Sequence, residues 1–278
     1  CVSLPPSLNS LYHSKLEVKH ALAIAVSQSG ASPDICSSLQ AAKERGATTI
    51  AIVNHTDSLL ANIADFVLPM HAGEELAVAA TKTYLASLSA LLQLITAFSG
   101  DKTLLNILPQ LPNALAQAAQ CDWSSATTRL AKAVNLIVMA RGAGYPIAAE
   151  AALKFKETAN IHAEAFSAAE FQHGPMALVR PAFPLLFFTQ LDATLPSTLA
   201  LCERMTHLGA QTLLAATNDD VINAKVAQQF LPLPPSLHPI CDPLLTIQAF
   251  YPMIAALAQQ RGYDPDQPNH LCKITETH

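Results

Sequence analysis

An internal repeat constrains the fold of this chain more than any other feature of its sequence. Residues 27–70 and 189–233 follow the same order: a polar loop, a helical stretch, Gly-Ala, an apolar run, an Asn/Asp turn, a short helical stretch and a second apolar run that ends in Leu-Pro. The offset of 163 residues between Gly46 and Gly209 is kept to the end of the repeat. Self-similarity over this length predicts two halves of similar structure.

Short apolar runs bounded by turn residues predict the strands of both halves. They span residues 21–26, 48–53, 66–68, 135–139, 184–188, 212–216 and 230–231. Helical stretches separate them, and long ones span residues 74–99, 103–119, 146–160 and 243–260. Because the apolar runs do not alternate with polar residues, we expect strands buried on both faces, which is typical of parallel sheets covered by helices. The predicted fold class is therefore α/β, with residues 101–125 as the linker between the halves.

The composition excludes several classes of protein. A chain of 278 residues, 51% of them hydrophobic and 13% charged, is long enough for two ordinary cores and is not typical of a disordered protein. Its formal net charge of −5 gives no cationic surface for a polyanion, so we expect no nucleic-acid partner. The apolar stretches 85–98 and 181–188 are interrupted or too short to cross a bilayer, and the first residues lack the features of a signal peptide. We therefore expect a cytoplasmic protein with no membrane partner.

Neither a metal nor an organic cofactor is predicted. The six cysteines are scattered and form no CxxC pair or Cys/His group with metal-ligand spacing, which favours free thiols. Residues 142–144 read Gly-Ala-Gly after a predicted strand, but the third glycine of a dinucleotide-binding loop is missing. The lysine of a nucleoside-triphosphate loop is missing as well.

The loop after the first predicted strand has the features of an anion-binding site. Gly30 allows close approach to the backbone, and Ser32 and Pro33 suit the cap and the first position of the next helix, whose unpaired N–H groups attract an anion. An ordinary strand-to-helix turn with a serine cap is the alternative. In the second repeat this loop has no glycine and contains Asp192, so we expect only the first copy to bind an anion.

A group of charged residues follows in the second half. Glu150, Lys154 and Glu157 are spaced four and three residues apart, so they lie on one face of a predicted helix. In a chain with few charges this group favours a chemical role, and a solvated stripe of salt bridges is the alternative. His162 and His173 follow closely, although either could be an ordinary core or surface histidine.

Four segments together resemble the sugar isomerase (SIS) family. They are SQSGASPD at 27–34, VAATKTYLASL at 78–88, the run from Glu150 to Pro175, and the tail DQPNHLCK at 266–273. The resemblance covers nearly all of the chain and extends to the isomerase half of glucosamine-6-phosphate synthases and to stand-alone SIS-type deaminases. It implies two SIS domains, over residues 1–118 and 119–278, each a parallel sheet flanked by helices in three layers.

The resemblance also assigns substrate-binding residues. It implies a sugar phosphate as substrate, with the sugar lying against the backbone near Val78 and against the position of Ala80. The residues that it assigns to the phosphate are Ser27, Gln28, Ser29 and Ser32.

Four further residues are assigned to the chemistry by the same resemblance. Glu157 is implied to transfer the proton between two carbons, with Lys154 beside it, and Lys273 of the tail is implied to close over the site. His173 is implied to open the sugar ring and to reach in from the neighbouring subunit of a homodimer. A histidine exchanges protons near neutral pH, a carboxylate can carry a proton between adjacent carbons, and a lysine can stabilise an oxyanion or form a Schiff base.

Two departures from the family bear on the substrate. Members of the family begin with a strand and a Gly/Ser loop that nothing before Ala21 supplies, and Ala80 stands where the synthases have a serine. The synthases take ammonia from a glutaminase domain, and no such domain follows Cys1. We therefore expect deamination of glucosamine 6-phosphate to fructose 6-phosphate and ammonia. The alternatives are a fructosamine-6-phosphate deglycase, a simple phosphosugar isomerase, and a sugar-phosphate sensor without catalysis.

Overall fold

The computed structural model of the chain describes residues 1–217, 226–271 and 273. Among these residues, no helix is long and apolar enough to cross a bilayer. The same residues contain no group of three or more His, Cys, Asp or Glu side chains placed to hold a metal ion.

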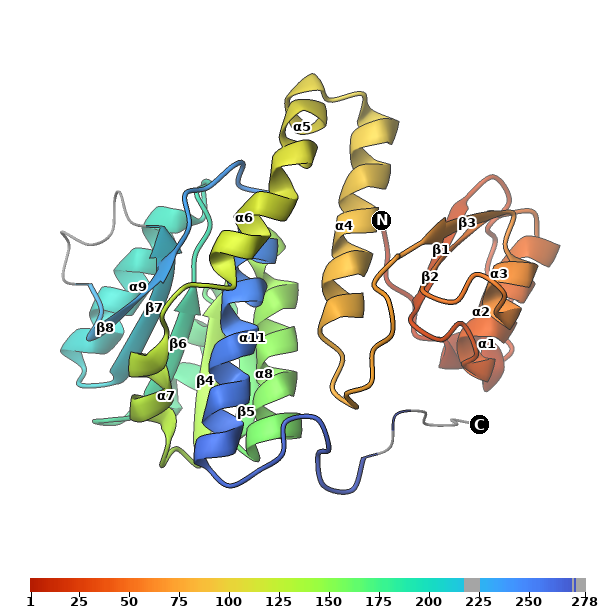
Figure 1. The fold of residues 1–278 in the computed structure, drawn as a ribbon. Helices are drawn as coiled ribbons and strands as arrows, with labels where there is room; N and C mark the ends of the chain where they lie inside the picture. The colour runs from red at the N-terminus through yellow and green to blue at the C-terminus, as the bar shows by residue number, and fades with distance from the viewer. Residues whose placement is uncertain (218–225, 272, 274–278) are drawn as a thin grey trace. The chain divides into compact units, whose positions relative to one another are not determined.

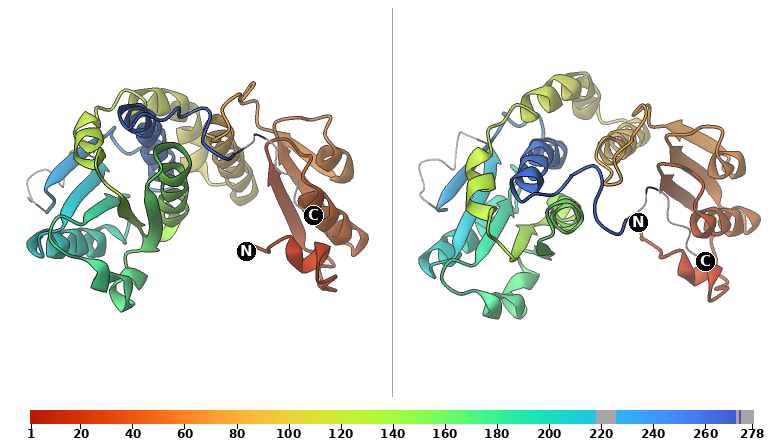
Figure 2. Two further views of the ribbon diagram at one scale, coloured as in Figure 1. Left: turned by 90° about the horizontal axis from the view of Figure 1, so that it is seen from below. Right: turned by 60° about the horizontal axis from the view of Figure 1, so that its bottom comes forward.

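The chain divides into two compact units. The first unit comprises residues 1–76 and 80–99 together with Lys273, and the second comprises residues 77–79 and 100–271. In Figures 1 and 2 each unit has its own sheet with helices packed against it. The domain boundary expected after residue 118 stays a prediction.

The first unit is built on a parallel sheet in the order β1, β2, β3. The strands span Leu22–Ser27, Thr48–Val53 and Phe66–Pro69, and the helices α1, α2, α3 and α4 span Ser7–Ser10, Pro33–Glu44, Leu59–Ile63 and Lys82–Ser99. Successive side chains of a strand point to opposite faces of the sheet. In β2, Ala51 and Val53 pack against α2 and α3, whereas Ile50 and Ile52 pack against α4. The unit therefore has three layers.

The second unit is built on a parallel sheet in the order β5, β4, β6, β7, β8. Strands β4 to β8 span Asn135–Ala140, His162–Ser167, Pro184–Phe188, Gln211–Thr217 and Gln229–Leu233. The helices α5, α6, α7, α8, α9 and α11 span Lys102–Ile107, Leu111–Ala118, Ser124–Leu130, Tyr145–Ala159, Leu195–His207 and Asp242–Gln260. Single turns of 3-10 helix, η1 to η4, span Leu108–Gln110, Gly142–Gly144, Glu170–His173 and Pro175–Leu178.

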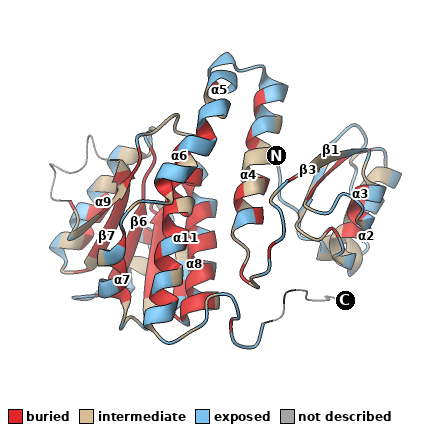
Figure 3. Cartoon of the chain, in the orientation of Figure 1, coloured by how far each residue is buried: buried red, intermediate tan, exposed pale blue. Residues whose placement is uncertain are grey.

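Aromatic side chains fill the core of the second unit. Phe250 of α11 packs edge-on against Phe155 of α8, with ring centroids 5.3 Å apart, and against Phe188 of β6 at 6.2 Å. On the other face of the sheet, Phe187 belongs to a cluster that includes Met205 of α9. Figure 3 shows the strands and the inner faces of α8 and α11 as buried. Helices thus cover both faces, and the predicted α/β class is confirmed.

The repeat seen in the sequence is confirmed as a structural repeat. In the first unit the order is β1, α2, β2, α3, β3 and α4, and in the second unit β6, α9, β7, β8 and α11 follow in the corresponding order. The short helical stretch expected between β7 and β8 falls on residues 218–225, which lie outside the described residues. In both units the three strands are neighbours and run parallel. The second sheet continues beyond β6 with β4 and β5, whereas β1 is an edge strand.

Two of the predicted helices differ from the structure. The helix expected from residue 74 begins at Lys82, because residues 74–81 form a loop around the carboxylate of Glu75. The helix expected over 103–119 is broken into α5, η1 and α6, where Pro109 and Pro112 each begin a new turn. Residues 101–125, expected as a linker, are therefore largely helical.

Two strand predictions are corrected as well. Strand β5 was not predicted, because its exposed His162 and Glu164 interrupt the apolar pattern at the edge of the sheet. Strand β1 was expected to be buried on both faces, but its side chains alternate between exposed and half-buried. Leu22, Ile24 and Val26 are 48%, 40% and 39% exposed, whereas Ala23 and Ala25, on the opposite face, pack against the cluster formed with α2 and α3.

Candidate active site

The loop from Ser27 to Ser32 joins the carboxyl end of β1 to α2. The hydroxyl oxygen of Ser27 accepts the N–H of Gly30 at 3.1 Å, and that of Ser29 accepts the N–H of Ala31 at 3.3 Å. A hydroxyl that accepts a hydrogen bond can still donate its own O–H to a ligand. Ser32 is the N-cap residue, as predicted, but its side chain makes no capping hydrogen bond.

Gly30 is required by the shape of this loop. Its φ is +62°, in the left-handed region, and a Cβ at this position would lie 2.1 Å from the hydroxyl oxygen of Ser58. The loop therefore brings its backbone against the start of α3, where Leu60 donates its N–H to the Gly30 carbonyl at 3.0 Å.

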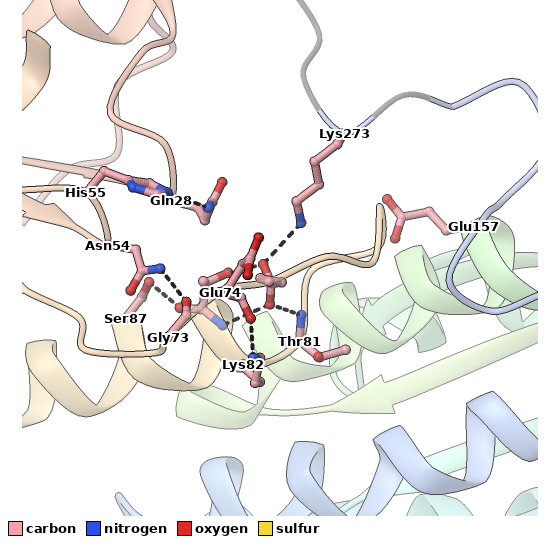
Figure 4. A network of polar contacts seen from close by, with 12 residues as sticks. Gln28, Asn54, His55, Gly73, Glu74, Thr81, Lys82, Ser87, Glu157 and Lys273 are labelled. Carbon is pink, nitrogen blue, oxygen red and sulfur yellow. Dashed lines mark hydrogen bonds and ion pairs between the residues drawn. The ribbon is translucent and has the colours of Figure 1, made fainter. Parts of the chain in front are cut away.

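The carboxyl end of β2 adds two polar side chains beside this loop. Asn54 donates its main-chain N–H to the Gln28 carbonyl at 3.2 Å. Its side-chain amide donates to the Gly73 carbonyl and accepts the N–H of Ala72. His55 Nε2 lies 3.4 Å from Gln28 Nε2 (Figure 4). Neither residue was predicted from the sequence, although both follow a buried strand directly, and the carboxyl ends of parallel strands meet at one edge of a sheet.

A buried carboxylate organises the loop before α4. Glu75 Oε1 accepts the N–H groups of Thr81 and Thr83 at 3.0 and 3.1 Å, and Oε2 accepts the Thr83 hydroxyl at 2.6 Å. Lys273 Nζ lies 3.4 Å from the same Oε2 (Figure 4). Burial alone would raise the pKa of the Glu75 carboxyl, but the hydrogen bonds from Thr83 and Thr81 and the charge of Lys273 outweigh it and hold the pKa below its usual value. The loop is thus folded around an ionised group.

Val78 and Ala80, which the resemblance places against the sugar, lie in this loop. Both are half-buried, and the N–H of Val78 donates to the carbonyl of Asp266 at 3.1 Å. The backbone of Val78 is therefore fixed by the segment that follows α11.

The second unit holds a cluster of four side chains from α8 and α11. Lys154 Nζ lies 2.6 Å from Glu157 Oε2 and 3.3 Å from Glu150 Oε1. The Tyr251 hydroxyl donates to the same oxygen of Glu150 at 3.0 Å. The side chain of Lys154 is 3% exposed, that of Glu150 7% and that of Glu157 21%. The alternative of a solvated stripe is therefore wrong.

The burial of this cluster changes the acidity of Glu150. Burial raises the pKa of the Glu150 carboxyl and the charge of Glu157 adds to this effect, while Lys154 and the Tyr251 hydroxyl oppose it. The net effect is a raised pKa. Groups with perturbed pKa values are enriched at functional sites, so this shift singles out the cluster as a candidate site.

Glu157 lies at a cavity of about 370 Å³ in the second unit. One side of the cavity is the end of α8, where Asn160 has a left-handed backbone and donates to the Tyr263 hydroxyl at 2.9 Å. The other side is the segment after α11, which Arg261 anchors by donating to the carbonyls of Ala159 and Ala131 at 2.8 and 2.7 Å. A carboxylate of limited exposure thus faces a space large enough for a small molecule.

The family model of the SIS domain matches residues 16–97 and 129–257 of the chain. The chain belongs to the SIS domain family. It is 33% identical over 256 residues to the isomerizing glutamine–fructose-6-phosphate aminotransferase of Aquifex aeolicus. The alignment covers 91% of this chain and 43% of that protein. It therefore spans less than half the length of that relative.

Two solved structures are similar to this SIS chain over most of its length. One is described as a phosphosugar isomerase from Silicibacter pomeroyi, with 38% identity and a TM-score of 0.88, covering 95% of this chain and 79% of the other. The second is the C-terminal domain of the glucosamine-fructose-6-phosphate aminotransferase of Francisella tularensis, with 28% identity and a TM-score of 0.79, covering 92% and 76%.

In the second SIS copy, side-chain carboxylates lie at the loop that corresponds to Ser27–Ser32 of the first copy. Asp242 of α11 accepts the N–H of Leu191 at 2.8 Å, and Asp192 accepts the N–H of Thr194 at 2.8 Å. Burial raises the pKa of the Asp242 carboxyl, against the hydrogen bonds that it accepts from Leu191 and Ser236. Side-chain carboxylates therefore already accept two of the N–H groups of this loop, and the expectation that only the first copy binds an anion stays a prediction.

Within the second unit, His173 does not share a cavity with Glu157. It is exposed at the end of η3 and lines a different cavity from the one that Glu157 lines. The other predicted residues fall into two sets. Lys154 and Glu157 are brought together in the second unit, whereas the loop from Ser27 to Ser32 and Lys273 belong to the first unit.

Proposed function

We propose that this protein interconverts the aldose and ketose forms of a sugar phosphate, and that it deaminates glucosamine 6-phosphate. The observation that carries the proposal is the buried cluster of Lys154 between Glu150 and Glu157, with Glu157 open to a cavity. A carboxylate that is held by a lysine and is partly shielded from water suits proton transfer between carbons. The relatedness to aminotransferases and phosphosugar isomerases supports the same substrate class.

In the proposed reaction the loop from Ser27 to Ser32 binds the phosphate. Its hydroxyls, the side chain of Gln28 and the unpaired N–H groups at the start of α2 are suitable donors for a dianion. The backbone near Val78 and the position of Ala80 take the sugar. His173 of the partner subunit opens the ring in a homodimer.

Glu157 then removes the proton from C2 of the open chain and returns it to C1. The intermediate is an enolamine, and the product is the imine of fructose 6-phosphate. Water adds to the imine carbon and ammonia leaves, so one water is consumed for each ammonia and fructose 6-phosphate formed. Lys154 supplies positive charge beside Glu157, and Lys273 closes over the open chain and stabilises the developing oxyanion.

The test is ammonia release from glucosamine 6-phosphate by the wild-type protein and by Glu157→Gln. We expect release by the wild type and a loss of at least about 100-fold in the variant, the lower range for a general base. The same protein is assayed with fructosamine 6-phosphates and with simple ketose phosphates. Release of an amine from the fructosamine 6-phosphates alone would identify a deglycase. No turnover of any sugar phosphate would contradict an enzymatic function.

A non-catalytic sensor is distinguished by a second measurement. Ligand binding to the folded state raises the melting temperature whether or not chemistry follows. A rise with sugar phosphates, combined with no turnover in any assay, would identify a sensor.

A further inference from the structure

The hydroxyl of Tyr251 is buried against the charged cluster and has no role in the reaction described above. Tyr251 is 8% exposed, comes from α11, and donates to Glu150 Oε1 at 3.0 Å. That same oxygen lies 3.3 Å from Lys154 Nζ. Glu150 Oε1 is thus held by two donors from two helices.

The charges in this cluster do not balance by themselves. Two carboxylates, Glu150 and Glu157, share one ammonium, that of Lys154, which lies closer to Glu157. A buried carboxylate with too few donors is costly, and either takes up a proton or draws its counter-ion closer. The Tyr251 hydroxyl supplies Glu150 with a donor that carries no charge, so Lys154 can stay 2.6 Å from Glu157.

We propose that Tyr251 is a positioning residue that divides Lys154 between the two carboxylates of α8. Its consequence for catalysis rests on the proposed function, whereas its effect on the charges of the cluster does not. Without the hydroxyl, Glu150 either becomes protonated or draws Lys154 away from Glu157. In both cases the charge next to the proton-transferring carboxylate changes.

The first test measures the melting temperature of Tyr251→Phe between pH 5 and pH 8. The titratable and charged groups that face Glu150 are Lys154 and Glu157 from α8 and Tyr251 from α11. Because the folded-state pKa of Glu150 is raised, ionising it costs stability as the pH rises above its unfolded value of 4.5. Loss of the hydroxyl raises that pKa further, so we expect a loss of about 3 °C at pH 8 that shrinks toward pH 5.

Two variants separate this effect from a loss of packing. In a Glu150→Gln background the carboxylate is absent, so Tyr251→Phe is expected to lower the melting temperature equally at every pH. Thr246→Val is the matched control, because Thr246 is 1% exposed on α11 and its hydroxyl donates to the main-chain carbonyl of Asp242. The loss of melting temperature in Thr246→Val is expected to be independent of pH.

The second test measures ammonia release by Tyr251→Phe against pH. We expect kcat to fall about tenfold with KM unchanged, and the acid limb of the kcat profile to move, because the charge beside Glu157 has changed. A melting-temperature loss that is the same at pH 5 and pH 8, or that keeps its pH dependence in the Glu150→Gln background, would overturn the proposal. If no sugar phosphate is turned over, the melting data still decide it.

Discussion

Single residues determine the shape of the loop from Ser27 to Ser32. Gly30 combines a left-handed backbone with a contact that leaves no room for a Cβ, whereas Gly73 has a similar φ of +69° and no neighbour within 4 Å of the Cβ position. We expect Gly30→Ala to destabilise the fold by about 2–4 kcal/mol from strain and overpacking. Gly73→Ala carries strain alone and should cost about 1 kcal/mol. Urea unfolding measures the free energy of unfolding of the two variants. Equal losses in both would mean that the contact with Ser58 is not rigid.

Glu75 is a second residue whose role is testable alone. Because its pKa is held below the usual value, its ionised form stabilises the fold at neutral pH, and that contribution is lost as the pH falls through the folded-state pKa. Glu75→Gln should therefore lower the melting temperature more at pH 7 than at pH 4. We also expect ammonia release to fall about tenfold, which corresponds to about 1.4 kcal/mol of lost interaction with Lys273.

The ion pair of Glu75 can be followed directly by chemical labelling. An amine-reactive reagent should modify Lys273 faster in Glu75→Gln, because the amine has lost its carboxylate partner. Lys43 is the internal control, since it pairs with Asp65 at 2.9 Å in the same unit. Unchanged labelling of Lys273 relative to Lys43 would show that the ion pair does not hold the tail.

At the scale of single elements, the sequence predicted those parts of the fold that local pattern determines. Strands β2 and β6 have the predicted bounds, because an apolar run with turn residues at both ends admits little else. The start of α4 was misplaced because the carboxylate that holds residues 74–81 as a loop takes its hydrogen bonds from tertiary structure. Strand β5 was missed because only its pairing with β4 makes a polar edge segment extended.

The candidate site was predictable to a similar degree. Spacing along one helix identified Glu150, Lys154 and Glu157 as a group, since residues three and four apart share a face. It could not identify Tyr251, which is 101 residues from Glu150 and meets it only because α11 packs on α8. His55 was missed because a single histidine after a strand is common, and its contact with Gln28 depends on the pairing of β1 with β2.

The assembly of the molecule can be tested through His173, which lines a different cavity from Glu157 within one chain. We propose that a site using both residues takes the histidine from a partner subunit. His173→Ala and Glu157→Gln should each be nearly inactive alone. When the two variants are mixed under conditions that exchange subunits, random pairing gives dimers in which one site has both native residues and the other has neither. Ammonia release should then recover to about one quarter of the wild-type rate, since about half of the dimers are mixed and each has one intact site. A mixture that stays as inactive as its components, although pull-down through a tag on one variant recovers the other, would place His173 and Glu157 in the same subunit's site or exclude the histidine from the reaction.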